Sequence, residues 1–330
     1  MTIINGREID IKYNYKNDIK EAILNNDPLD DKLNVIIVIS NPCLYAKRYK
    51  LANEFIKRMK NEKHVELYVV EFTYGNQKFI ITEKNNKNHL QLNTLTPLWH
   101  KENMINIGIK KLLPKNWKAV AWIDADVEFD SPSWALDTLK ILNGSRDIVQ
   151  LFSHCIDMDQ NENTLNMFQS FGFKYSKQKQ YFPSGIDYFH PGFAWACTQK
   201  AYSKINELYQ MGILGSGDFN MSMCLIQYGL LSIHKHTTEG YKKSILDFQN
   251  KISTLRLGYV PGVISHYFHG SKKNRKYKER WQILVKHQYD PYIHLTTDEN
   301  GILIPTDKFP EELKKDIMLY FKERNEDEFI

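Results

Sequence analysis

The chain has few cysteines and no long apolar run, and both shortages narrow what it can be. Its 330 residues include four cysteines, which lie far apart without a Cys-x-x-Cys pair, so neither a disulfide framework nor a zinc knuckle is expected. No stretch approaches the roughly 18 apolar residues of a membrane span, and the first residues lack the apolar segment of a secretory signal. We therefore expect a soluble, cytoplasmic protein with no membrane span.

The excess of positive over negative charge is also small. The formal net charge is +5 over 330 residues, which is too dilute for a nucleic-acid-binding surface, so no nucleic-acid partner is expected. The weak positive balance instead favours contact with small phosphorylated molecules. Hydrophobic residues make up 42% and charged residues 25% of the chain, which are ordinary values for a globular protein with a full core.

Strand-like and helix-like patterns alternate in the first half of the chain. Residues Asn34–Ser40 read NVIIVIS, a β-branched run typical of a strand buried on both faces, and Val65–Phe72 is a second such run. Apolar residues recur at helical spacing over Leu44–Met59 and Leu98–Leu113. A third apolar strand is expected at Ala119–Ile123. This order predicts an α/β fold around a parallel sheet.

The second half is less regular. Residues 157–187 are polar and aromatic with little periodicity, so we expect a long loop over a site. The segments Phe189–Thr198 and Tyr259–Gly270 look strand-like, and Lys276–His287 has the pattern of a basic amphipathic helix. The first 32 residues show no sustained period and are expected to form a peripheral arm or a short strand pair.

Two carboxylates follow the third strand directly. Asp124 and Asp126, in the sequence WIDADVEF at 122–129, are spaced i, i+2 at the edge of an α/β sheet where ligands usually bind. Hard divalent cations take carboxylate oxygens and bridge diphosphate oxygens, so the pair fits Mg²⁺ or Mn²⁺ holding a nucleotide diphosphate. Because such pairs also occur as solvated strand ends, the spacing alone does not decide between the two interpretations.

A glycine-rich turn and a histidine pair could complete the chemistry. Asp218 ends the sequence Gly-Ser-Gly-Asp at the start of an expected helix, where it is either an N-cap or a general base for an acceptor hydroxyl. His266 and His269 are spaced i, i+3, and imidazole suits Mn²⁺ better than Mg²⁺. These histidines are either metal or phosphate ligands or ordinary core and surface residues.

Basic and aromatic side chains surround these positions. Arg275 and Arg280 either neutralise a diphosphate or belong to a solvated helix face. His190, Phe193 and Trp195 either form a stacking surface for a sugar ring or pack in the core.

The order of these motifs resembles the GT-A glycosyltransferases of the β-1,4-galactosyltransferase and chondroitin N-acetylgalactosaminyltransferase group, over roughly residues 33–285. The family's Asp-Val-Asp resembles Asp124-Ala125-Asp126, which implies Asp126 as a metal ligand and Asp124 as a donor contact. Its Gly-Gly-Glu-Asp resembles the turn ending at Asp218, which implies a base role there, with Gly217 in place of the family's Glu. Its Met-x-x-His has the spacing of His266 and His269, which implies that both bind the metal.

Two further segments carry the resemblance. The family's Asn-Arg-Ala helix is similar to WHKENMINIG at 99–108, which implies that Lys101 and Asn106 face the nucleotide sugar. Its glycine-rich acceptor segment is similar to residues 190–195, which implies acceptor contacts from His190, Phe193 and Trp195. The family's arginine-rich turn after the first strand is replaced here by Asn41-Pro42.

The resemblance implies a GT-A (Rossmann-like) nucleotide-sugar-binding sheet with helices on both faces and a fused acceptor-side half. The expected regions are an N-terminal arm at 1–32, a nucleotide-sugar-binding half at 33–130 and an acceptor-binding half at 131–330 that continues the same domain. The expected activity is transfer of a sugar from a nucleotide diphosphate donor, a UDP-sugar first of all, to a glycan or another hydroxyl acceptor. The expected cofactor is Mn²⁺ or Mg²⁺, and the expected stereochemistry is inversion.

Two other functions fit parts of the sequence. A haloacid-dehalogenase-like phosphatase also places Asp-x-Asp after a strand, although its nucleophile normally follows the first core strand and here a strand, a helix and a second strand come earlier. A non-catalytic carbohydrate-binding protein would need the aromatic segment alone. Trapping of a phosphoaspartate at Asp124 would identify the first, and nucleotide binding without turnover would identify the second.

Overall fold

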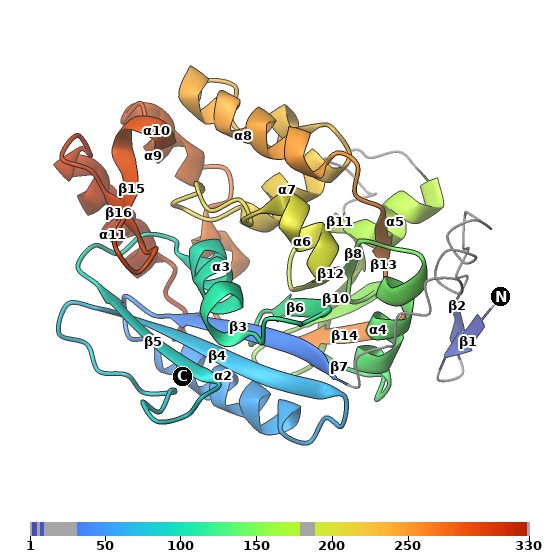
Figure 1. Ribbon diagram of the computed structural model, residues 1–330. Coiled ribbons are helices and arrows are strands. Elements are labelled where there is room, and N and C mark those ends of the chain that lie inside the picture. Colours follow the sequence, from blue (N-terminus) through green and yellow to red (C-terminus); the bar gives the residue numbers. More distant parts are fainter. Residues whose placement is uncertain (1, 5–6, 10–31, 179–188, 329–330) are drawn as a thin grey trace.

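The computed structural model describes residues 2–4, 7–9, 32–178 and 189–328, which form an α/β fold (Figure 1). Its central sheet has seven strands in the order β13-β8-β12-β6-β3-β4-β5. The strands are β3 (Leu33–Ser40), β4 (Val65–Tyr74), β5 (His89–Thr94), β6 (Ala119–Ile123), β8 (Ile148–Gln150), β12 (Ala194–Thr198) and β13 (Leu257–Tyr259). The mostly parallel sheet that the sequence predicts is confirmed.

One strand of the central sheet is antiparallel to the strands on both sides of it. Strands β6, β3, β4 and β5 are parallel to one another, and β8 is parallel to β13. Strand β12 is antiparallel to both β6 and β8. Strands from residues 33–130 and from residues 131–330 therefore share one sheet, and β6, which ends directly before Asp124, lies near its middle.

Helices cover both faces of this sheet because the side chains of β3 alternate between two cores. Ile36 packs in the core on the side of α3, whereas Val35 and Ile37 pack in the core on the side of α2 and α4. The helices are α2 (Ala46–Met59), α3 (Lys101–Leu112), α4 (Trp134–Gly144), α6 (Gln199–Ile205), α7 (Gly217–Leu225) and α8 (Glu239–Ile252). This is the helix arrangement that the sequence predicts.

A second sheet has five strands in the order β11-β10-β9-β14-β7. Its strands are β7 (Val127–Phe129), β9 (His154–Met158), β10 (Thr164–Ser170), β11 (Phe189–His190) and β14 (Val263–His266). Strand β7 begins directly after Asp126, so the acidic pair occupies the short link between the two sheets. Each of the strand-like segments 189–198 and 259–270 is divided between these sheets rather than forming one strand.

The long loop predicted over residues 157–187 is wrong for the part of it that the structure describes. Strand β10 and helix α5 (Phe171–Gln178) lie there, and residues 179–188 fall outside the described residues. The sequence hides β10 because its first four residues are exposed to solvent. A strand that is open to water has no need for alternating apolar residues, so no period of two is visible.

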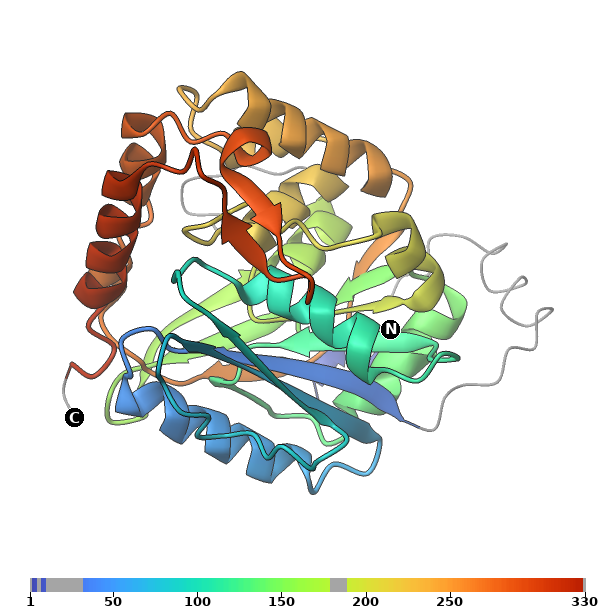
Figure 2. The same ribbon diagram turned by 60° about the vertical axis from the view of Figure 1, so that its left-hand side comes forward.

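The C-terminal part of the chain returns to the start of α2. Helix α9 (Arg280–Lys286) is shorter than the predicted helix at 276–287, and α10 (Pro291–His294), β15 (Leu295–Thr297), β16 (Leu303–Pro305) and α11 (Glu311–Glu323) follow it. Figure 2 shows the end of the chain beside the first turn of α2. At the other end, β1 (Thr2–Ile4) and β2 (Arg7–Ile9) form an antiparallel pair.

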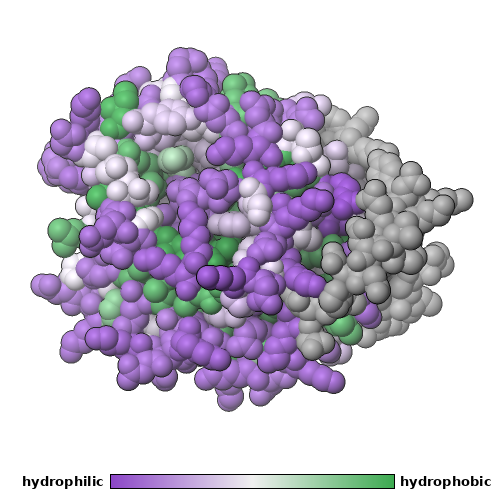
Figure 3. All heavy atoms as spheres, viewed as in Figure 1, coloured by the Kyte–Doolittle hydropathy of each residue, from purple (hydrophilic) through white to green (hydrophobic). Residues whose placement is uncertain are grey.

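The surface is mainly polar. In Figure 3, hydrophilic residues cover most of the visible face and apolar residues appear between them near its middle. Among the described residues, no helix has both the length and the apolar character needed to cross a membrane.

Gly108 fixes the distance between α3 and the central sheet. A Cβ at this position would lie 2.8 Å from Cγ2 of Val70 and 3.4 Å from Cγ2 of Ile36. We expect Gly108→Ala to lower the free energy of unfolding by about 1 to 2 kcal/mol, because overpacking outweighs the gain in helix propensity. Urea denaturation would measure it, with Lys111→Ala on the exposed side of the same helix as control. Equal or higher stability of Gly108→Ala would contradict the tight packing.

Candidate active site

A cavity of about 760 Å³ lies where the two sheets meet. Its wall includes the end of β3, the start of α3, the acidic pair, and residues from β10, α7, β14 and the C-terminal segment. Ten of the residues predicted to act at a site line this cavity: Lys101, Asp124, Asp126, His190, Phe193, Asp218, His266, His269, Arg275 and Arg280. Segments that are far apart in the sequence therefore converge on one hollow at the carboxyl edge of the central sheet.

Asp126, His266 and His269 form a compact group in this cavity. One potential ligand atom from each residue lies within 4.8 Å of the others. The Oδ2 atom of Asp126 is 2.8 Å from Nε2 of His269 and 3.8 Å from Nε2 of His266. One carboxylate and two imidazoles are a ligand set that suits Mn²⁺ and other first-row divalent metals.

Pairing of β7 with β14 brings the group together. Val127 is opposite His266 in this antiparallel pair, and the backbone N–H of Tyr267 donates to the carbonyl oxygen of Asp126 at 2.8 Å. The strand register therefore places Asp126 beside His266. His269 lies three residues after His266, and its imidazole is close to the same carboxylate.

Two buried atoms of the group are unsatisfied. Asp126 Oδ1 and His266 Nε2 have no hydrogen-bond partner among the described residues. Asp157 accepts a hydrogen bond from Nδ1 of His266 at 2.7 Å, which leaves Nε2 with a lone pair, and burial lowers the pKa of His266. Because buried polar atoms are normally paired, these two atoms fit a missing cation. The residues present are therefore compatible with a metal.

Arg275 binds the same imidazole from another side. Its Nη2 lies 2.8 Å from Nε2 of His269, and a guanidinium can only donate, so that nitrogen acts as an acceptor. Burial opposes ionisation of Asp126, but His269, His266 and Arg275 together hold its pKa well below the ordinary value. The carboxylate is thus kept ionised, as a metal ligand must be.

Lys101 connects the first acid of the pair to Asp218. Its Nζ lies 2.6 Å from Oδ1 of Asp124 and 2.9 Å from Oδ2 of Asp218. Burial opposes the charge, but the two carboxylates raise the pKa of Lys101 well above its usual value. Burial also raises the pKa of Asp124 to about 6, although the Lys101 ammonium opposes that shift. The first residue of α3 therefore links the strand end to the start of α7.

Asp218 is not the N-cap of α7, which was the structural alternative for it. Ser216 occupies that position with φ of 77°, and Asp218 lies in the first turn with its carboxylate lining the cavity. Gly217 between them tolerates no side chain, because a Cβ there would lie 2.2 Å from Oε1 of Glu102. Arg280 supports this turn by donating to the carbonyl oxygen of Leu214 at 3.1 Å and to the hydroxyl of Ser216.

The aromatic segment lies beside Asp218. The rings of His190 and Phe193 stack with centroids 4.1 Å apart, and both line the cavity. Gly192 between them allows the approach, because a Cβ there would lie 3.4 Å from Oδ2 of Asp218 and 2.9 Å from Cε1 of His190. Phe193 has φ of 78°, a conformation that L-residues rarely adopt and that is often found at functional sites.

Two predicted site residues lie outside the cavity lining. Trp195 is fully buried in the core, and its Nε1 donates to the carbonyl oxygen of Pro191 at 2.7 Å. Asn106 is also buried, with its side chain bonded to the backbone of Leu208 at 2.8 and 3.0 Å and to the hydroxyl of Tyr202 at 3.1 Å. Both side chains therefore hold neighbouring segments in place beneath the cavity wall and do not form part of its surface.

Sequence reasoning missed three polar residues near the group. Asp157 orients His266, Arg48 lines the cavity from α2, and Glu326 reaches it from the C-terminal segment. Asp157 lies between buried Cys155 and Met158 on β9, so a charged residue in an otherwise apolar strand was the available signal. Nothing local in the sequence relates Glu326 to the histidines, because the contact is between distant parts of the chain.

Comparison with known proteins gives neighbours in structure but none in sequence. No family model matches the chain, and no curated protein matches it. A 4-diphosphocytidyl-2C-methyl-D-erythritol synthase from Anaerococcus prevotii is 13% identical with a TM-score of 0.34, covering 89% of this chain and 96% of that one.

Two other solved structures are glycosyltransferases. A Drosophila β-1,4-galactosyltransferase 7 mutant in complex with manganese, UDP-Gal and xylobiose is 10% identical with a TM-score of 0.35, covering 83% of this chain and 93% of that one. Mouse xyloside xylosyltransferase 1 in its apo form is 10% identical with a TM-score of 0.31, covering 71% and 97%. Because TM-scores of this size do not establish common ancestry or function, the activity has to be inferred from the site itself.

Glu102 gives the site a pH dependence that can be measured. Burial raises the pKa of this carboxyl to about 8 from an ordinary value of 4.5, and Asp218 adds to the shift while Lys101 opposes it. Between about pH 4.5 and pH 8 the folded state therefore holds a proton that the unfolded chain has lost, so stability falls as pH rises through this window. Glu102→Gln should be less sensitive to pH in this range and more stable than the wild type at pH 8.

Urea denaturation of both proteins at pH 5, 6.5 and 8 would test this expectation. The exposed substitution Glu299→Gln is a matched control, since it removes one carboxylate without changing the buried site. The same fall in stability between pH 5 and pH 8 in Glu102→Gln and in the wild type would contradict the raised pKa.

Proposed function

We propose that the protein is a metal-dependent glycosyltransferase that moves a sugar from a nucleotide diphosphate donor to an acceptor hydroxyl. A UDP-sugar is the first candidate donor, and a glycan is the first candidate acceptor. The observation that carries the proposal is the group of Asp126, His266 and His269 with two buried unsatisfied atoms, in the same cavity as Asp218. A cation site and a carboxylate base in one cavity fit metal-dependent sugar transfer with inversion.

The donor half would be built around the cation site. Asp126, His266 and His269 would hold Mn²⁺, or Mg²⁺, which when bound supplies positive charge to the leaving diphosphate. Arg275 contacts His269, so its guanidinium is placed to bind a phosphate oxygen, and Arg280 lies on the same side of the cavity beyond Tyr277.

The donor sugar would then lie over Asp124 and Lys101. These two side chains form an ion pair on the cavity wall, between the cation site and Asp218. Asn106 lies one turn further along α3, where its buried amide holds the helix against the loop at Leu208. Its contribution to donor binding would be to position Lys101.

Asp218 would act as the general base. Its carboxylate lines the cavity 2.9 Å from Nζ of Lys101, where it could accept a proton from the acceptor hydroxyl. The stacked rings of His190 and Phe193 would contact the acceptor beside it, while Trp195 supports that segment from the core. Attack from this side, opposite the leaving group, would invert the anomeric centre.

Metal-dependent binding of a sugar nucleotide is the first test. We expect Mn²⁺ together with one nucleotide diphosphate sugar to raise the melting temperature, because a ligand at a hundred times its dissociation constant adds about 2.7 kcal/mol to stability. A panel of sugar nucleotides with and without Mn²⁺ would be compared by thermal denaturation. Asp126→Asn should lose the metal-dependent shift, whereas Glu128→Gln, a more exposed acid two residues away, should keep it.

The outcomes of this test separate the alternatives. A shift with one sugar nucleotide supports the donor half of the proposal. Absence of any shift would contradict it and would direct attention to a phosphatase, for which phosphoaspartate at Asp124 could be trapped. A shift without transfer to any acceptor would favour a binding protein.

Asp218 is tested separately from donor binding. Once a donor and an acceptor are known, we expect Asp218→Asn to reduce transfer by about 10² to 10⁴-fold, the usual contribution of a general base. The metal-dependent rise in melting temperature should remain, because Asp218 is not in the cation group. Near-normal transfer by Asp218→Asn, with transfer abolished by Asp126→Asn, would show that the base is not Asp218.

A further inference from the structure

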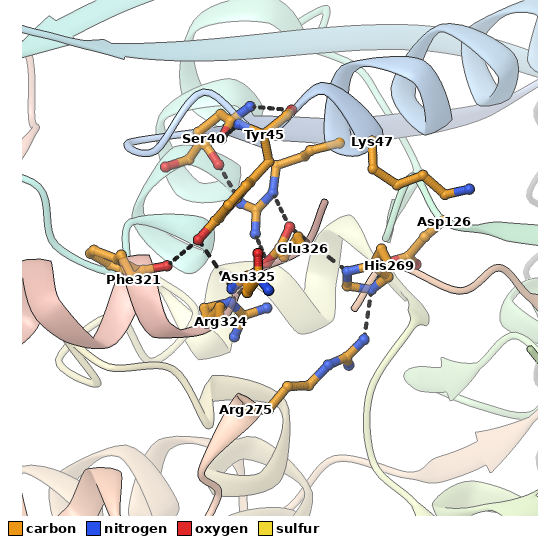
Figure 4. Close-up of polar contacts among 12 residues, drawn as sticks. Ser40, Tyr45, Lys47, Asp126, His269, Arg275, Phe321, Arg324, Asn325 and Glu326 are labelled. Atoms are coloured by element: carbon orange, nitrogen blue, oxygen red, sulfur yellow. Dashed lines mark hydrogen bonds and ion pairs between the residues drawn. The ribbon is translucent and has the colours of Figure 1, made fainter. Parts of the chain in front are cut away.

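The C-terminal segment Phe321–Glu328 is bound to the start of α2. The hydroxyl of Tyr45 donates to the carbonyl oxygens of Phe321 and Lys322, each at 2.8 Å, and accepts from the backbone N–H of Asn325 at 3.1 Å. The carboxylate of Asp327 accepts from the first two N–H groups of α2 at 2.9 Å. These contacts fix residues 321–328 against the wall of the cavity (Figure 4).

Glu326 is the residue of this segment that turns inward. It is 2% exposed, and its carboxylate accepts from Nε of Arg48 and from Nε of Arg324, each at 2.8 Å. Its Oε2 atom lies 3.8 Å from Nδ1 of His269. Figure 4 shows Glu326 on one side of the His269 ring and Arg275 on the other.

The two nitrogens of His269 therefore have different neighbours. Nε2 lies 2.8 Å from Oδ2 of Asp126 and accepts from Arg275, whereas Nδ1 lies 3.8 Å from the Glu326 carboxylate. A proton on Nδ1 is attracted to Glu326 and leaves the one lone pair of Nε2 to Arg275 or, in its place, to a cation that Asp126 also binds. Asp157 is closer to His266, whose Nδ1 donates to it at 2.7 Å.

The simpler interpretation is that Glu326 only neutralises two arginines. Those ion pairs are real, and one buried carboxylate between two guanidiniums is a reasonable structural element. Oε2 accepts from Nε of Arg48, but that ion pair does not require the same oxygen to lie 3.8 Å from Nδ1 of His269 as well. Carboxylates behind metal-binding histidines fix the ring and its tautomer, and their loss typically weakens metal binding.

We propose that Glu326 is a positioning residue for the metal centre: it holds His269 with the proton on Nδ1, so that Nε2 is available to the cation. The inference rests on the metal centre of the proposed function and adds to it a residue from the other end of the chain. Arg48 and Arg324 in turn hold Glu326, so α2 and the C-terminal segment would support the centre together.

Binding of Mn²⁺ alone to the full chain tests the proposal. Glu326→Gln should reduce the affinity for Mn²⁺ by about 10- to 100-fold, as measured by calorimetry at constant pH. Glu326→Asp is the second variant, because it keeps the negative charge that the two arginines need while moving the carboxylate away from His269. It should also bind Mn²⁺ more weakly, with a melting temperature close to that of the wild type in the absence of metal.

Asp327→Asn is the matched control. Asp327 lies next to Glu326 and anchors the same segment through α2, but its contacts are with the backbone of residues 46 and 47 rather than with the histidine. We expect Asp327→Asn to bind Mn²⁺ like the wild type. An equal loss of affinity in Asp327→Asn and Glu326→Gln would overturn the proposal, because the effect would then come from anchoring the segment.

Nitrogen NMR spectra of the histidine rings with Mg²⁺ bound give a second measurement, because without a cation the Asp126 carboxylate, 2.8 Å from Nε2, also attracts the ring proton. His269, assigned by loss of its signal in His269→Gln, should carry its proton on Nδ1 in the wild type and lose part of that preference in Glu326→Asp. A ring protonated on Nε2 in the wild type would overturn the proposal, and so would unchanged Mn²⁺ affinity in both Glu326 variants while the wild type binds. If the wild type bound no Mn²⁺, the proposal would fall together with the metal centre.

Discussion

The candidate site depends on the pairing of two short strands, β7 and β14. This pairing holds the backbone of Asp126 next to that of Tyr267, and the two histidines flank that point. Without it, the acids would be the end of β6 alone, because His266 and His269 come to Asp126 from β14 and the chain that follows it, not from the central sheet. The second sheet therefore turns an ordinary strand end into a potential cation site.

Charge balance is a second constraint on the site. The acids of the Asp-Ala-Asp turn belong to separate networks: Asp124 is paired with Lys101, and Asp126 is surrounded by His266, His269 and Arg275. Neighbouring ionised carboxylates repel each other, and these two are only partly exposed, so each is stabilised by its own positive partner. The spacing of two residues allows this, since it separates the carboxylates enough to serve different neighbours on one cavity wall.

Much of the fold and part of the site could be predicted from the sequence. Buried strands such as β3 and β6 are visible because both faces are apolar, and Asp124 and Asp126 are conspicuous at the end of one of them. Strand β10 was missed because its first four residues are exposed to water, and Glu326 was missed because its contact with His269 exists only after the chain has folded. Local patterns report burial, whereas the partners of a polar side chain depend on long-range topology.

The order of the site residues along the chain has a consequence for how the protein is made. Asp126 leaves the ribosome well before β14 and His269, and at about 5 to 20 residues per second the interval is on the order of ten seconds. During that time β7 has no β14 to pair with, so an open strand edge beside Asp124 and Asp126 is exposed to other chains in the cell before the histidine and arginine partners of Asp126 have been made. The like charges on those acids would discourage such contacts, and the carboxylates would thereby protect the nascent protein before they serve the mature one.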